Sequence, residues 1–224
     1  MPAPVTVIIP VLNEEERIAA AVGSAIAADA AEVLVVDGGS TDRTARYATA
    51  AGGKVLLGRE MRSRQMNDGA RAAANPFLIF LHADTLLPPG AAAAVHGALI
   101  HGIVFGGFRI RFAEGGWQLR MAAAMVNART AITRAPWGDQ AQFIARDTLL
   151  AAGGFREIPL MEDYELAARM RRAGRTRVLP MRVTTSGRRF LKKGLLRTAA
   201  INWSIVWKYR HGAEPEELAR KYRG

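Results

Sequence analysis

Three apolar runs, each followed by a short polar and acidic turn, occur within the first 84 residues. Near-continuous apolar runs are typical of parallel strands, because both faces of a parallel sheet are buried. Ligands of open α/β sheets bind just outside the carboxyl ends of such strands. Carboxylates at these ends favour a hydroxylated, phosphorylated ligand held through a divalent metal. We therefore expect a site in the turns that follow residues 5–11, 33–36 and 77–81.

The segments between these runs have helical patterns. Strands predicted at 5–11, 33–36, 54–57 and 77–81 alternate with helices predicted at 14–28, 43–51 and 62–74. Gly52-Gly53 ends the second helix, and Asn75-Pro76 ends the third. Strands alternating with helices in this order predict an α/β fold with a doubly wound, mostly parallel sheet.

The pattern changes after Asp84. We predict helices at 88–98, 117–133, 147–152 and 162–173, and strands at 104–112, 142–144 and 177–185, the first of which should be antiparallel. Neither a repeat nor a linker separates this half, so it should continue the same sheet. The predicted organisation is one α/β domain over residues 1–190 and a basic, amphipathic helical tail over residues 191–224.

Charge is distributed unevenly along the chain. The net charge is +11, and residues 182–224 contain eleven basic and three acidic residues, which leaves +8 on this segment. A basic tail on a nearly neutral domain predicts an anionic partner. Trp203 and Trp207 lie among these cations, a composition typical of an interfacial helix on an anionic membrane surface. The alternative is a C-terminal helix whose Trp face packs on the domain, and the two interpretations are compatible if each uses one face of the helix.

Composition also indicates a compartment. The chain has no cysteine, its N-terminus lacks the basic stretch and apolar core of a signal peptide, and no apolar run reaches the ~20 residues of a membrane span. We expect a cytoplasmic protein that is at most peripheral, at the inner face of the cytoplasmic membrane.

Four motifs bear on function. In chain order they are Ile8-Ile9-Pro10-Val11-Leu12-Asn13-Glu14-Glu15, Val35-Val36-Asp37-Gly38-Gly39-Ser40-Thr41-Asp42, His82-Ala83-Asp84, and Gly153-Gly154-Phe155 followed by Glu162-Asp163. Together they resemble a family 2 glycosyltransferase with the GT-A fold, over roughly residues 5–186. The resemblance implies metal-dependent, inverting transfer of a sugar from a UDP- or GDP-sugar to an unknown acceptor. We find no Gln-X-X-Arg-Trp motif of processive members, so chain polymerisation is not expected.

On the donor side, the resemblance implies that Asp37 accepts a hydrogen bond from the nucleotide base and that arginine near the third helix meets phosphate. Plain helix capping by Asp37 and a solvated arginine face explain the same residues. The implied nucleotide-binding residues are Pro10, Asn13, Glu14, Asp37, Gly39, Arg64, Asn67, Gly69 and Ala83.

His82-Ala83-Asp84 stands where the family has its Asp-X-Asp metal motif. Asp84 offers the oxygen that Mg²⁺ and Mn²⁺ prefer, and a nitrogen ligand from His82 would favour Mn²⁺ slightly. A hydrogen-bonded structural histidine is an equal alternative for His82. We therefore predict Mn²⁺ or Mg²⁺ as cofactor, with Asp84 as the main protein ligand.

On the acceptor side, the resemblance implies that Asp163 is the catalytic base and that Glu162 supports it. Trp137 could stack on a sugar, and Asp139 or Gln140 could bond its hydroxyls, while Arg188 and Arg189 could bind diphosphate. Acidic helix capping and a buried Trp are the structural alternatives. A basic tail also makes a lipid-linked acceptor a reasonable expectation.

Two other functions fit parts of the sequence. A non-catalytic nucleotide- or membrane-binding protein on the same fold would explain the loss of one metal-motif carboxylate. A nucleotidyltransferase has a similar sheet, but residues 9–16 contain no Gly or basic residue. A dehydrogenase is disfavoured because no Gly-X-Gly-X-X-Gly follows the first strand, and no nucleic-acid motif accompanies the basic tail.

Overall fold

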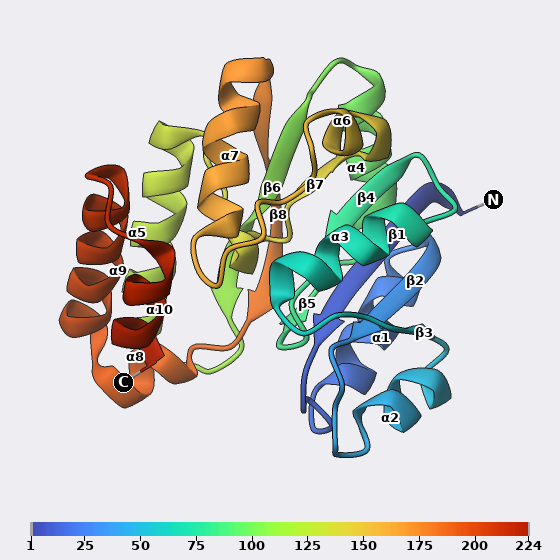
Figure 1. Cartoon of the computed structure of the whole chain (residues 1–224), viewed down its shortest axis with the longest axis horizontal. Helices are drawn as coiled ribbons and strands as arrows, with labels where there is room; N and C mark the ends of the chain where they lie inside the picture. Colours follow the sequence, from blue (N-terminus) through green and yellow to red (C-terminus); the bar gives the residue numbers. More distant parts are fainter. Residues whose placement is uncertain (1, 224) are drawn as a thin grey trace.

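The computed structural model describes residues 2–223, and one eight-stranded sheet runs through them in the order β3-β2-β1-β4-β7-β6-β8-β5 (Figure 1). The first four of these strands are parallel. β7 runs antiparallel between β4 and β6, whereas β6 and β8 are parallel. The strands are β1 (Ala3–Val11), β2 (Ala30–Asp37), β3 (Lys54–Leu57), β4 (Phe77–Phe80), β5 (Thr85–Leu86), β6 (Phe105–Phe112), β7 (Phe143–Ala145) and β8 (Thr176–Thr185).

Helices cover both faces of this sheet, because successive strand side chains point to opposite faces. Val7 and Ile9 of β1 pack in a core with α1, α2, α4 and α5, while Ile8 packs in a second core with α3, α6 and α7. The helices are α1 (Ile18–Ala27), α2 (Thr44–Ala50), α3 (Arg62–Ala72), α4 (Ala91–Ile100), α5 (Trp117–Thr133), α6 (Arg146–Ala151), α7 (Glu162–Ala173), α8 (Arg188–Lys193), α9 (Leu195–Arg210) and α10 (Pro215–Arg223).

The predicted α/β class and the doubly wound, largely parallel sheet are confirmed, and the second half continues the same sheet. Three details differ. The first helix begins at Ile18 rather than at residue 14, because residues 15–17 form a separate turn in which the N–H groups of Arg17 and Ile18 both bond to the Glu14 carbonyl. β5 was not predicted, and its two residues pair with Thr185 and Thr184 of β8, far along the chain. The strand predicted at 104–112 is antiparallel to β7 but parallel to β8.

The C-terminal segment forms three helices, α8 to α10, beside α5 at one end of the molecule (Figure 1). Ile205 of α9 and Leu218 of α10 pack with Ile158 and Met161 in a third apolar cluster. Trp203 and Trp207 instead lie in solvent. One side of α9 therefore packs on the rest of the protein, but it is not the side that contains the tryptophans. Among the described residues, no helix combines the length and the apolarity that spanning a membrane requires.

Gly69 provides a test of the packing between α3 and the sheet. A Cβ at this position would lie 2.5 Å from Ile8 Cγ2 and 3.0 Å from Val36 Cγ2. We expect Gly69→Ala to lower the free energy of unfolding by about 1–3 kcal/mol, the usual cost of overpacking a core.

The matched control is Gly97→Ala in α4, where an added Cβ meets nothing within 4 Å. It should raise stability by about 0.5–1 kcal/mol, because alanine is the better helix former. Urea denaturation of both variants makes the comparison, and equal effects of the two substitutions would contradict the packing described here.

Candidate active site

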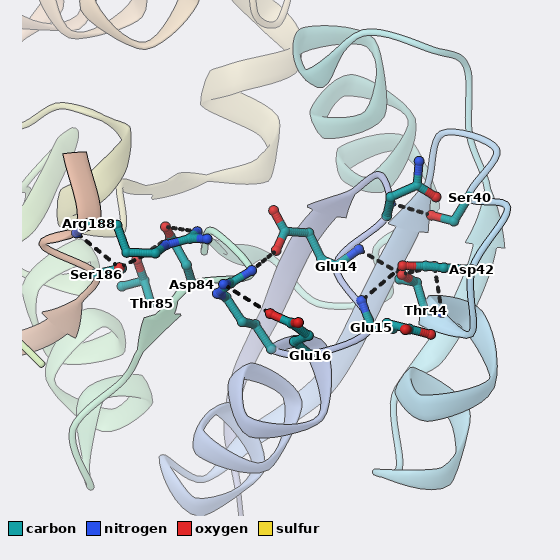
Figure 2. A network of polar contacts seen from close by, with 12 residues as sticks. Glu14, Glu15, Glu16, Ser40, Asp42, Thr44, Asp84, Thr85, Ser186 and Arg188 are labelled. Atoms are coloured by element: carbon teal, nitrogen blue, oxygen red, sulfur yellow. Dashed lines mark hydrogen bonds and ion pairs between the residues drawn. The ribbon is translucent and has the colours of Figure 1, made fainter. Parts of the chain in front are cut away.

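The loops after β1 and β2 are tied together by side-chain hydrogen bonds (Figure 2). The Asn13 N–H donates to Ser40 Oγ over 2.9 Å, and Asn13 Oδ1 accepts from the Thr41 N–H over 2.9 Å. The Glu14 N–H donates to Thr44 Oγ1 over 2.8 Å. Pro10, one residue before the end of β1, pairs with Val36 of β2. These bonds make one fixed rim from two loops, at the carboxyl ends of two adjacent parallel strands.

Asp37 ends β2 and is only 5% exposed. Its Oδ1 accepts from the N–H groups of Gly39 and Ser40 and from Ser40 Oγ, at 3.1, 2.8 and 2.7 Å. Gly39 has φ of 100°, a backbone conformation that favours glycine. Asp37 therefore shapes this turn through Oδ1. All three of these hydrogen bonds end on that one oxygen, which leaves Oδ2 for a ligand.

The other predicted donor residues of α3 make internal contacts. Arg64 Nε donates to Glu157 over 3.0 Å. The buried Asn67 amide bonds the backbone of Phe155 in both directions, at 2.9 and 2.8 Å. Gly69 lies against the sheet, as described above, and Ala83, which precedes Asp84 in the chain, is buried. Asn67 therefore fastens α3 to the Gly153-Gly154-Phe155 loop.

Arg62, the first residue of α3, was not among the predicted residues. Its Nε and Nη2 lie 2.6 and 2.5 Å from Glu162 Oε1, and its Nη1 is 3.4 Å from His82 Nε2. The Glu162 side chain is 2% exposed, and its Oε2 has no partner within the described part of the chain. Arg62 thus joins the starts of α3 and α7 to the His82 loop. Its place at a helix start was the available signal, but helical spacing alone did not separate it from Arg64.

A short 3₁₀ turn, Gly138–Gln140, brings His82 and Asp163 together. The Gly138 N–H donates to Asp163 Oδ2 over 2.6 Å, and the Tyr164 N–H donates to Asp163 Oδ1 over 2.7 Å. A Cβ on Gly138 would lie 2.7 Å from His82 Nε2 and 3.0 Å from Asp163 Oδ2. Only glycine fits this contact, and it fixes the predicted base beside the predicted metal motif.

His82 is neutral at physiological pH. Burial and the nearby Arg62 guanidinium lower the pKa of its imidazole to about 4, against the opposite influence of Asp84 and Asp163. A neutral imidazole has a free nitrogen lone pair, which a metal ligand requires. The environment of His82 is therefore compatible with metal ligation.

Asp84 and His82 form a sparse donor set. Among residues 2–223 no third His or acidic side chain joins them in a metal-binding group. Mg²⁺ in nucleotide enzymes is usually bound through one or two carboxylates plus substrate phosphates and water. One carboxylate and one neutral imidazole fit that pattern for Mn²⁺ or Mg²⁺, provided that the diphosphate supplies further ligands.

Two arginines after β8 lie near Asp84. Arg188 Nη2 is 3.7 Å from Asp84 Oδ2 (Figure 2), and the Arg189 guanidinium stacks 4.1 Å from the centre of the Tyr222 ring. Partial burial and Arg62 lower the pKa of Arg189, while Asp139 and Asp84 oppose that change. Arg189 therefore lies within electrostatic reach of the same carboxylates.

Asp139 is the least satisfied acid of the site. Its Oδ1 is buried without a hydrogen-bond partner among the residues that the structure describes. Burial raises the pKa of its carboxyl to about 6, with Asp163 and Asp84 adding to the effect and Arg129 opposing it. An unpartnered buried acceptor is costly, which favours a role toward a bound hydroxyl.

Trp137 and Gln140 are held by Arg129, which sequence reasoning missed. The Arg129 guanidinium lies 3.5 Å from the centre of the Trp137 ring, and its Nη2 donates to Gln140 Oε1 over 2.9 Å. Gln140 is fully buried, and its Oε1 also accepts from Thr130 Oγ1 and the Trp137 N–H. The hydrogen bonds of the Gln140 side chain are therefore made inside the protein, where they stabilise the turn.

The family profile described as glycosyl transferase family 2 matches residues 6–153. The chain belongs to glycosyl transferase family 2. It is accordingly a glycosyltransferase, and the matched segment contains the donor-side loops, the His82-Ala83-Asp84 motif and the Trp137 turn. By sequence, none of the proteins of curated function matches it.

Solved structures of glycosyltransferases share the fold. The mannosyltransferase PcManGT of Pyrobaculum calidifontis, in complex with GDP-Man and Mn²⁺, is 19% identical, with a TM-score of 0.67 over 98% of this chain and 69% of that one. TarS (1–349) of S. aureus is 20% identical, with a TM-score of 0.62 over 83% of this chain and 60% of that one. Glucosyl-3-phosphoglycerate synthase of Mycobacterium tuberculosis, in complex with Mn²⁺, UDP and glucosyl-3-phosphoglycerate, is 21% identical. Its TM-score is 0.59 over 82% of this chain and 71% of that one. This chain spans 65% of another similar mycobacterial protein. At these identities the likeness establishes the GT-A fold.

The Asp139 environment predicts a pH-dependent gain from its removal. Because the folded-state pKa lies above the ordinary value, wild type loses stability as pH rises from about 4 to about 6 and the buried carboxyl ionises. Asp139→Asn avoids this charge. At pH 8 it should be more stable than wild type by up to about 3 kcal/mol, since each pKa unit corresponds to about 1.4 kcal/mol.

Thermal unfolding at pH 8 and pH 4 measures this difference, which should vanish at the lower pH. Asp147→Asn, at an acid whose side chain is 88% exposed, is the control and should change little at either pH. A variant that is less stable than wild type at pH 8 would mean that Asp139 stabilises the fold.

Proposed function

We propose that this family 2 glycosyltransferase moves a single sugar from a UDP- or GDP-sugar to an acceptor hydroxyl, with inversion and with a divalent metal. One observation supports this proposal above the others. The turn at Gly138 contacts both His82 and Asp163, so the predicted metal motif and the predicted base border one space. Transfer needs a leaving-group side and an acceptor side next to one another, and these two motifs would supply them.

The donor nucleotide would lie along the rim made by the loops after β1 and β2. Asp37 Oδ2, beside the end of β1 and Gly39, is available to the base. Complexes of the similar proteins with GDP-Man or UDP support a nucleotide in the corresponding fold. We assign Asn13 and Glu14 to the fixed loop that the nucleotide contacts, and Arg64, Asn67 and Gly69 to the support behind it.

Asp84 and His82 would hold Mn²⁺ or Mg²⁺. When bound, such an ion neutralises the charge that develops on the departing diphosphate. Arg188 and Arg189 are the protein's own contribution to the same task, since guanidinium groups bind phosphate through paired hydrogen bonds. Similar proteins in complex with Mg²⁺ or Mn²⁺ support this cofactor.

Asp163 would accept the proton of the acceptor hydroxyl while that oxygen attacks the anomeric carbon. The bond from this carbon to the diphosphate oxygen breaks in the same displacement, which inverts the configuration. The N–H groups of Gly138 and Tyr164 hold both carboxylate oxygens in place. Asp139 and Trp137 would orient the acceptor, and Glu162 would act indirectly by fixing Arg62.

The acceptor is proposed to be lipid-linked or otherwise close to a membrane, at the inner face of the cytoplasmic membrane. The charge of +8 over residues 182–224 supports this partner. In this proposal residues 1–190 perform the transfer, and the tail over residues 191–224 contacts the surface.

Donor binding should depend on metal through Asp84. Asp84→Asn removes a charged ligand, so we expect the affinity for UDP-glucose or GDP-mannose in the presence of Mn²⁺ to fall at least ~10-fold. Calorimetry with Mn²⁺ and with a chelator measures this, and Asp147→Asn serves as the exposed control. Equal affinity with Mn²⁺ and with chelator would exclude the metal role.

Turnover should depend on Asp163. Asp163→Asn keeps an oxygen for the Gly138 N–H but cannot take a proton, so turnover should fall by roughly 10²–10⁴ with donor affinity nearly unchanged. Donor turnover assays and calorimetry give the two quantities. The control is Glu165→Gln in the same helix. The Glu165 carboxylate pairs with Arg169 four residues further on, so its loss should leave turnover near wild type. Loss of donor binding with normal residual turnover would move Asp163 to the donor site.

A further inference from the structure

Helix α9 exposes a row of large apolar side chains. Leu196, Trp203 and Trp207 are 81%, 64% and 60% exposed, and their spacing of seven and four residues puts them on one helical face. The packing of α9 uses a different face, with Ile205 in an apolar cluster. The exposed row is therefore not needed for this packing. Contiguous exposed apolar side chains usually mark a contact surface.

A basic hollow lies next to this row, between α9 and α10. Its volume is about 350 Å³, and it has a cationic rim and an apolar floor. Arg197, Lys208 and Lys221 form the rim, and Ile201, Ile205 and Leu218 contribute to the floor. Lys221 also pairs with Glu217. This arrangement suits an anionic group that is attached to an apolar body.

We infer that α9 and α10 form a membrane-docking face for bilayers that contain anionic phospholipid. Leu196, Trp203 and Trp207 enter the interfacial layer, where aromatic side chains are favoured. The hollow receives a lipid phosphate.

The charge of this segment favours an anionic bilayer over a second copy of the chain or a nucleic acid. A second copy of the chain would bring the same cationic tail, with +8 over residues 182–224, against its own like charge. Nucleic acid would satisfy the cations but would leave the row of Leu196, Trp203 and Trp207 without an apolar environment. An anionic bilayer satisfies both the cations and the apolar row.

The docking face connects directly to the acceptor side of the site. Tyr209 of α9 meets Tyr164 edge to face, with ring centres 6.1 Å apart, and Tyr164 meets Trp137 in the same way at 6.4 Å. Tyr164 follows Asp163 in the chain. Docking would therefore hold the acceptor side near the bilayer. This consequence rests on the proposed transfer to a membrane-proximal acceptor, whereas lipid binding itself does not.

Helix α5 also exposes large apolar side chains. It lies beside α9 at the same end of the molecule (Figure 1). Trp117, Met121, Met125 and Ile132 are exposed along it, at spacings close to whole helical turns.

Vesicle co-sedimentation of the full chain tests the inference, without donor or metal. The probes are vesicles of phosphatidylcholine alone and of phosphatidylcholine mixed with phosphatidylglycerol. Wild type should bind only the anionic vesicles, and less at high salt, because screening shortens to about 3 Å at 1 M. Removing the rim charges (Arg197→Gln, Lys208→Gln, Lys221→Gln) should weaken binding by roughly 100-fold, at about 1 kcal/mol per cation.

A matched variant tests whether binding depends on the docking face itself or only on the net charge of the protein. Arg46→Gln, Arg172→Gln and Arg175→Gln remove three exposed cations outside the tail and should leave most of the binding intact. Trp203→Ser with Trp207→Ser should weaken binding while donor affinity, measured by calorimetry, stays at the wild-type value. That unchanged affinity also verifies folding.

Several results would overturn the inference. They are failure of wild type to bind anionic vesicles, equal loss in the matched variant, or a dimer that the Trp substitutions dissociate. Failure of docking leaves donor binding and turnover testable with soluble protein. Failure of transfer leaves vesicle binding unaffected, so the two proposals can fail separately.

Discussion

The ion pair between Arg62 and the buried Glu162 is the interaction on which the site depends. It joins α3 to α7, which lie on the same face of the sheet but come from opposite halves of the chain. Glu162 precedes Asp163, so the pair fixes where α7 starts and where the proposed base points. Arg62 also helps to keep His82 neutral. The Arg62 side chain is 41% exposed and only Glu162 is fully buried, so the pair is half-buried; removing Arg62 would leave the buried Glu162 carboxylate without its partner.

Around this pair the charges of the site nearly cancel. The acids Asp84, Asp139, Glu162 and Asp163 face the guanidinium groups of Arg62, Arg129, Arg188 and Arg189. A diphosphate alone would add negative charge beside carboxylates, including Asp139, whose ionisation burial already disfavours. A divalent cation that arrives with it would leave the balance unchanged. Electrostatics thus gives a physical reason for the proposed joint binding of donor and metal.

Strand ends were predictable from the sequence, and side-chain directions were not. The apolar runs predicted the parallel strands. Residues at or just after the carboxyl ends of these strands, such as Asp37 and Asp84, therefore lie at one edge of the sheet. The sequence could not separate Arg62 from Arg64 or Asp139 from Gln140, because one or two positions along a turn decide which side chain faces the site. Gly138 acts through contacts with His82 and Asp163, which are distant in sequence, and Arg129 acts through its contact with the Trp137 ring. Such contacts leave no local pattern.

The tail illustrates the same division between pattern and packing. Its composition allowed either a membrane surface or a packing helix, and the structure packs one face of α9 on the protein while another face stays exposed. Ile205 and Tyr209 pack toward Met161 and Tyr164, while Trp203 and Trp207 remain outside. Because packed interiors transmit displacement rather than absorb it, a force on the outer face of α9 would reach the Tyr164 ring and the start of α7. The proposed acceptor geometry and the proposed membrane contact are therefore coupled through one helix.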